Sequence, residues 1–188
     1  MGKRAKPKQR ITADVLISVS KAMLPFYKAI ATRSKYAAEW SKAVKSGDLA
    51  RMQKLMRLVS PSLGDELGTN GIGYFITFPF PRSDVHFTNG TTIPPGSVQF
   101  LFETRVHRSI ARGVLPLYRK LSTCRTFALA LARAIRRRNT KAVARMIRLH
   151  VRTPALKSVS IESSGFALLF GYKFSKYKYR NLLIREDY

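Results

Sequence analysis

Two stretches of this chain, 91 positions apart, have closely similar sequences. The first begins with LPFYK at Leu24 and the second with LPLYR at Leu115. Chance supplies about two identities in 35 positions, so a larger number indicates an internal duplication. Laid over each other without a gap, the two stretches share eight identical pairs: Leu24/Leu115, Pro25/Pro116, Tyr27/Tyr118, Thr32/Thr123, Ala37/Ala128, Ala43/Ala134, Arg57/Arg148 and Leu58/Leu149.

Each copy is predicted to contain helices followed by strands. Apolar positions stay apolar between the copies at helical spacing, and Asp48 and Asn139 occupy the same position, where each is suited to cap the next helix. Alternating apolar residues predict strands in GIGYFITFPF and SGFALLFGYKF, and further strands in DVHFTN, SVQFLFET, KSVSIES and KYKYRNLLI. We therefore expect about three helices and then a β-hairpin or short meander in each copy.

The predicted fold class is α+β. A single two-stranded ribbon is only marginally stable in water, so the copies are expected to join their strands into one shared antiparallel sheet with the helices packed on it. The chain then divides into a basic flexible arm at residues 1–10, copy one at residues 11–104 and copy two at residues 105–188, with NGTTIPPGS as the loop between the copies. We expect one pseudo-twofold domain.

The repeated Pro and Tyr residues are predicted to be structural. Pro25 and Pro116 lack a backbone N–H, so each is expected to mark a kink or a new helix start, near the first helical turn. Tyr27 and Tyr118 are then expected to pack into the core, with their hydroxyl groups hydrogen-bonded at its edge.

The charge of the chain is high and uneven. It carries 35 Lys and Arg residues against 10 Asp and Glu, a formal net charge of +25. Residues 1–104 hold 15 basic and 7 acidic residues, residues 105–188 hold 20 and 3, and no acid lies between Glu103 and Glu162. Ordinary solvated surfaces mix both signs of charge, because interspersed acids relieve repulsion. The second copy is therefore predicted to contact a polyanion: nucleic acid, anionic lipid or an acidic protein surface.

Arginine is the main cation of the second copy, by 14 residues to 6 lysines. Its planar guanidinium group is suited to bidentate hydrogen bonding with phosphate. The third helix of this copy is expected to carry a continuous cationic ridge opposite an apolar stripe that includes His150. The residues predicted to bind nucleic acid are Arg112, Arg119, Arg133, Arg136, Arg137, Arg138, Lys141, Arg145, Arg148, Arg152, Lys173, Lys176, Lys178 and Arg180.

The last four of these cations alternate with aromatic residues in the predicted C-terminal strands. Two interpretations stay open here. An exposed strand of this kind stacks bases while its cations follow a single-stranded backbone. Alternatively, the aromatic rings face the core and the lysines protect a sheet edge from aggregation.

No catalytic, metal or cofactor site is predicted. His86, His107 and His150 are scattered without a partner at metal-ligand spacing, and no P-loop Lys-Ser/Thr follows the glycine-rich stretch GDELGTNGIG, which we interpret as a turn. Cys124 is the only cysteine, which suits a reducing compartment and a packing role. We recognise no signal peptide and no apolar run of bilayer length, and expect a cytoplasmic or nucleoid-associated protein.

The function expected from the sequence is non-catalytic binding of nucleic acid through its phosphate backbone, as in an architectural or packaging protein. One alternative is a cationic membrane-active protein, such as an antibacterial toxin, that binds anionic lipid. A second alternative is a coat or scaffold subunit that assembles into homo-oligomers around nucleic acid.

Overall fold

A computed structural model of the chain describes residues 10–80 and 85–185. In this part of the chain, three helices precede three strands, and the same order then repeats. The helices are α1 (Ala13–Thr32), α2 (Ser34–Ser46), α3 (Leu49–Arg57), the 3-10 helix η1 (Pro61–Leu63), α4 (Thr104–Thr123), α5 (Arg125–Arg136) and α6 (Thr140–Arg148). The strands are β1 (Leu67–Thr69), β2 (Gly73–Phe80), β3 (Val85–Thr92), β4 (Leu156–Glu162), β5 (Gly165–Phe170) and β6 (Tyr179–Arg185). The mixed helix and sheet content confirms the predicted α+β class.

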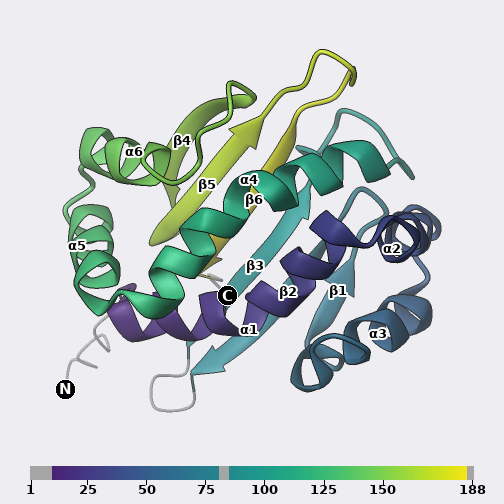
Figure 1. Cartoon of the computed structure of the whole chain (residues 1–188), viewed down its shortest axis with the longest axis horizontal. Helices are drawn as coiled ribbons and strands as arrows, with labels where there is room; N and C mark the ends of the chain where they lie inside the picture. The colour runs from purple at the N-terminus through teal and green to yellow at the C-terminus, as the bar shows by residue number, and fades with distance from the viewer. Residues whose placement is uncertain (1–9, 81–84, 186–188) are drawn as a thin grey trace, which may run out of the picture.

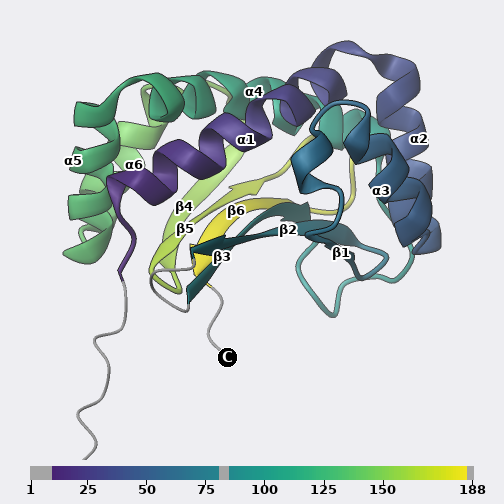
Figure 2. The same ribbon diagram turned by 90° about the horizontal axis from the view of Figure 1, so that it is seen from below.

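The strands of both halves form one antiparallel sheet with the order β1-β2-β3-β6-β5-β4. The halves meet where β3 pairs with β6, with Gly90 opposite Leu182. The helices cover one face of this sheet: α1 and α4 cross it side by side, α2 and α3 lie at the β1 end, and α5 and α6 lie at the β4 end (Figures 1 and 2). This layering follows from the apolar faces of α1 and α4, which supply most of the helical core.

The predicted helix caps are present. Asp48 Oδ1 accepts a hydrogen bond from the backbone N–H of Arg51 at 2.9 Å, and Asn139 Oδ1 accepts one from Ala142 at 3.0 Å. Each bond satisfies one of the free N–H groups in the first turn of α3 or α6, and so fixes where these helices begin.

The prediction that the two prolines lie near a helix start is wrong. Pro25 and Pro116 each lie in the second half of one continuous helix, α1 or α4, rather than near a helix start. Both prolines are exposed, so their rings do not disturb the core. Packing of α1 against α4 therefore outweighs the local cost of proline.

Three further segments differ from the prediction. The stretch SVQFLFET forms a loop, in which Phe100 has a φ of 51° that an extended strand excludes, while buried Phe102 anchors the loop to the core. The first four residues of NGTTIPPGS complete β3, and residues 171–178 form a loop between β5 and β6 instead of strand. The glycine-rich stretch interpreted as a turn contains the short strand β1. When loop side chains anchor to a core, apolar and polar residues alternate along the sequence much as they do in a strand.

By length and composition α1 would also be able to cross a membrane, in contrast to the expectation from its sequence. Its polar residues are too few to lower the mean hydropathy of the helix below that of a membrane span. In the fold, however, 56% of its most apolar stretch is buried. Its apolarity is accounted for by its packing beside α4 on one face of the sheet.

Four buried polar side chains form a closed ring of hydrogen bonds where the two halves meet, beneath α1 and α4. Tyr27 Oη donates to Asn89 Oδ1 at 2.7 Å, and Asn89 Nδ2 donates to Tyr118 Oη at 2.6 Å. Tyr118 Oη donates to Asn181 Oδ1 at 3.0 Å, and Asn181 Nδ2 donates to Tyr27 Oη at 2.8 Å. Burial raises the pKa of both tyrosines, so both hydroxyls stay protonated. The tyrosines are in the core as predicted, but their hydroxyls bond at its centre rather than at its edge.

A second buried polar pair, with one residue from each half, lies beside this ring. Tyr74 Oη is 2.9 Å from His107 Nε2, and both side chains are fully buried. Burial lowers the pKa of His107 to about 3, so the imidazole is neutral at physiological pH. At the position of His107 in the gapless alignment, the first copy has Leu16.

We predict that Tyr27→Phe lowers the free energy of unfolding by about 1–3 kcal/mol, because it leaves the buried amide oxygen of Asn89 without its donor and removes one of the acceptors of the Asn181 amide. Chemical denaturation of the variant and the wild type measures this difference. Tyr36→Phe is the control, because its hydroxyl donates to a single half-buried carbonyl, that of Leu55. Equal stability of Tyr27→Phe and the wild type would show that the ring does not hold the halves together.

We also predict that the stability of the protein falls below pH 6.5 because of His107. The unfolded imidazole binds a proton near pH 6.5, whereas the folded one binds it only near pH 3, so the unfolded state gains protons first as the pH falls. This difference costs about 2 kcal/mol between pH 7 and pH 5. Denaturation curves of wild type and His107→Leu at both pH values isolate the effect, since the other titrating groups are common to both proteins. An identical pH dependence of the two would refute the assignment.

Candidate nucleic-acid interface

The cations predicted to bind nucleic acid lie along the second half of the chain, and most are exposed. Only Arg136 and Arg180 are half-buried. They are distributed over α4 (Arg112, Arg119), α5 and its C-terminal end (Arg133, Arg136, Arg137, Arg138), α6 and the residues after it (Lys141, Arg145, Arg148, Arg152), the β5–β6 loop (Lys173, Lys176, Lys178) and β6 (Arg180). Of the predicted basic arm, only Arg10 lies within the described residues.

The end of the molecule formed by α5 and α6 carries four cations that we call the α5–α6 cations: Arg133, Arg137, Lys141 and Arg145. All four are exposed, and none has a side-chain partner among the described residues. Within each pair, Arg133 with Arg137 and Lys141 with Arg145, the spacing of four residues places both side chains on one side of the chain. At the opposite end of the sheet, by contrast, Arg51 on α3 is paired with Glu39 on α2 at 2.8 Å.

The continuous ridge predicted along the third helix is interrupted. Helix α6 ends at Arg148, so Arg152 lies in the loop that follows it. The Arg148 guanidinium donates to the carbonyl of Leu156 at 3.2 Å, and Arg152 Nε donates to that of Leu149 at 2.9 Å. These two arginines therefore help to hold the connection from α6 to β4. On the opposite side of the helix, the predicted apolar stripe is buried at Val143 and Ile147 and half-buried at Met146 and His150.

Three of the four C-terminal cations, the lysines, lie in the loop between β5 and β6, where their aromatic neighbours pack on one another. The ring of Tyr172 stacks on Phe170 and on Phe174, with centroids 6.4 and 5.0 Å away. The guanidinium of Arg105 lies 3.9 Å from the centre of the Phe174 ring, and Arg180 pairs with Glu162. Protein groups thus lie over the rings of Tyr172 and Phe174, although Phe174 remains 39% exposed, and the three lysines of this loop are exposed as well.

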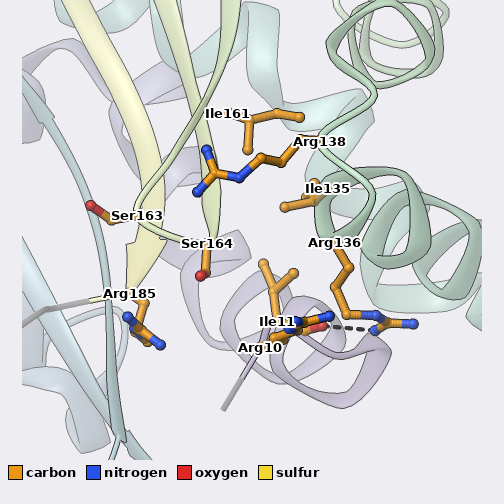
Figure 3. A pocket seen from close by; sticks show the side chains of 9 residues that line it. All are labelled: Arg10, Ile11, Ile135, Arg136, Arg138, Ile161, Ser163, Ser164 and Arg185. Carbon is orange, nitrogen blue, oxygen red and sulfur yellow. Dashed lines mark hydrogen bonds between the residues drawn. The ribbon is translucent and has the colours of Figure 1, made fainter. Parts of the chain in front are cut away.

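A pocket of about 310 Å³ lies at the same end of the molecule as α5, and we call it the arginine pocket (Figure 3). Its walls come from the approach to α1, the end of α5, the β4–β5 turn and the end of β6. None of its nine described lining residues is acidic. They are Arg10, Ile11, Ile135, Arg136, Arg138, Ile161, Ser163, Ser164 and Arg185.

Main-chain contacts hold the walls of the arginine pocket together. The Arg136 guanidinium donates to the carbonyl of Ile11 at 2.9 Å, which ties α5 to the start of α1. The backbone N–H of Arg185 donates to the carbonyl of Ser163 at 2.8 Å, which ties β6 to the β4–β5 turn. Figure 3 shows the Arg138 side chain extending from the end of α5 toward Ser164. The pocket is therefore built by elements that the fold fixes on every side.

Only part of this pocket is predictable from the sequence. Arg136 and Arg138 were predicted from the RAIRRRN run, and Arg10 was placed in a flexible arm. Arg185 and the two serines were missed, because 175 positions separate Arg10 from Arg185 and only the sheet brings them together. The one local signal is the Ser-Ser pair between two alternating apolar runs, which is typical of a turn but not of a site.

Cys124 lies at the junction of α4 and α5 rather than inside a helix, and its Sγ is 3.3 Å from Thr126 Oγ1. Hydrogen bonding to Thr126 lowers the pKa of this half-buried thiol. Within residues 10–80 and 85–185, no three His, Cys, Asp or Glu side chains are grouped so that they could hold a metal ion.

In comparisons with known proteins, no family model, no curated protein and no solved structure matches this chain.

Proposed function

We propose that this protein binds nucleic acid through the phosphate backbone, with little base specificity and without catalysis, as an architectural or packaging protein. The observation that carries this proposal is the group of α5–α6 cations. They are exposed, they have no side-chain partner among the described residues, and they lie in a segment without a single acid from residue 104 to residue 161.

The charge of this surface is unbalanced. Four unpaired cations on neighbouring helices repel one another, and a surface that met only water would be more stable with acids interspersed. A phosphate backbone removes this repulsion, and it releases the counterions condensed on the nucleic acid. Such binding depends on the charge and the spacing of the cations. It needs no helix or strand that contacts base edges in a groove of the nucleic acid.

We also infer that the two halves arose by duplication and form a pseudo-twofold unit. Helices α1 and α4 begin and end 91 residues apart, and the sheet order reads the same from either edge when β1, β2 and β3 are exchanged for β4, β5 and β6. The ring supports the same inference, because Tyr27 aligns with Tyr118 and Asn89 lies 92 residues before Asn181. After the duplication, only the second half would have lost its acids and become the binding half.

The proposal is tested by measuring oligonucleotide binding over a salt series. Fluorescent duplex and single-stranded oligonucleotides are titrated with nuclease-treated protein, and the logarithm of the affinity is plotted against that of the salt concentration. For the duplex, replacing the four α5–α6 cations by Ala should reduce the slope by up to about four, since each neutralised phosphate contributes about 0.9.

The matched control is a second quadruple Ala variant at exposed lysines of the first half: Lys28, Lys42, Lys45 and Lys54. It removes the same charge from the other half of the chain and should weaken binding much less. Equal losses in the two variants would contradict a specific binding surface. Leakage of anionic vesicles without oligonucleotide binding would instead favour the membrane-active alternative.

A further inference from the structure

We propose that the arginine pocket is a phosphomonoester site, which seats the terminal phosphate of a nucleic-acid strand. The identity of the ligand as a strand end rests on the proposed function. The phosphomonoester chemistry rests on the pocket alone.

The charge and donors of the pocket fit a doubly charged phosphate. Four arginines and two serines line it, and none of its described lining residues is acidic. A terminal phosphate carries up to two negative charges and three free oxygens, whereas a phosphodiester within a strand carries one charge. Guanidinium groups bind such oxygens with paired, charge-assisted hydrogen bonds. The pocket should therefore favour the end of a strand over its interior.

The backbone around the pocket is strained where its polar side chains arise. In the described part of the chain, four residues other than glycine have positive φ angles, and three of them line this pocket: Arg138 at 52°, Ser163 at 36° and Ser164 at 56°. Side chains in this conformation lower stability relative to glycine, and such strain clusters at ligand sites.

The first half of the chain has glycine at two of these three positions. Gly47, with φ 66°, aligns with Arg138, and Gly71, with φ 77°, aligns with Ser163 at the offset that also relates Gly73 to Gly165. The fold thus accepts glycine at both places. The second half has instead an arginine and a serine whose side chains line the pocket, at a cost in backbone strain. A ligand for these side chains explains the difference between the halves.

The remaining walls suit the sugar that carries the phosphate. Ile11, Ile135 and Ile161 give the pocket an apolar side, and a volume of about 310 Å³ leaves room for more than a phosphate group. The Arg136 guanidinium is held by the carbonyl of Ile11, which fixes this part of the pocket wall before a ligand arrives.

The test compares single-stranded oligonucleotides of one sequence that carry a 5′-phosphate, a 3′-phosphate or hydroxyl groups at both ends. Each carries its fluorophore at an internal position, and all are titrated with the full chain at one salt concentration. We expect one of the phosphorylated ends to bind about tenfold more tightly than the hydroxyl-ended strand. Equal affinities of all three oligonucleotides would overturn the inference, while the backbone-binding proposal would stand.

Variants toward glycine separate this role from a structural one. Arg138→Gly and Ser163→Gly relieve positive-φ strain, so we expect their melting temperatures to equal or exceed that of the wild type. The ratio of the affinities for the phosphorylated and the hydroxyl-ended strand, which measures the preference, should fall toward one. Arg137→Ala is the matched control: it removes the neighbouring charge outside the pocket, and should weaken binding of all strands while the preference remains. A preference that survives in Arg138→Gly would count against the pocket.

Nucleoside monophosphates distinguish a strand end from a free nucleotide. If a monophosphate raises the melting temperature of the wild type but not of Arg138→Gly, and no oligonucleotide binds, the phosphomonoester site stands and the proposed function fails. If neither monophosphates nor oligonucleotides bind, both proposals fail.

Discussion

The ring of Tyr27, Asn89, Tyr118 and Asn181 is the interaction on which the rest of this structure depends. Each half of the chain supplies one tyrosine and one asparagine, and each asparagine donates to the tyrosine of the other half. Both asparagines also donate to the neighbouring central strand, at Leu182 and Gly90. All of these groups are buried, so an alternative register of β3 on β6 would leave several of them unpaired. The ring thus favours one way of joining the halves.

Around this common centre the two halves differ in ways that bear on function. The first half has acids that pair with its cations, as Glu39 does with Arg51, and it has glycine, Gly47 and Gly71, at the positions that align with Arg138 and Ser163. The second half has an acid-free surface on α5 and α6, and side chains where glycine would be less strained. Core positions change more conservatively, because close packing limits them, whereas the ends of the sheet are free to acquire new chemistry.

Local signals in the sequence predicted much of the fold. Helix caps at Asp48 and Asn139 and alternation in the strands succeeded because they reflect interactions between residues that are close in sequence. The errors arose where distant contacts decided the outcome. The packing of α1 on α4 keeps Pro25 inside a helix, and burial of Phe102 makes a loop resemble a strand. The candidate surface on α5 and α6 was predictable as charge, but whether each cation is free or tied to the main chain was not.

The sequence by itself determined that the chain has two similar halves, a mixed α+β fold and a second half without acids over most of its length, because these are properties of composition and periodicity. The tertiary structure alone decided that Arg10, Arg138 and Arg185 share one pocket and that two tyrosines and two asparagines close a ring. Both features join residues that are far apart in the chain, and their positions are set by the antiparallel pairing of β3 with β6 and by the packing of helices on one face of the sheet.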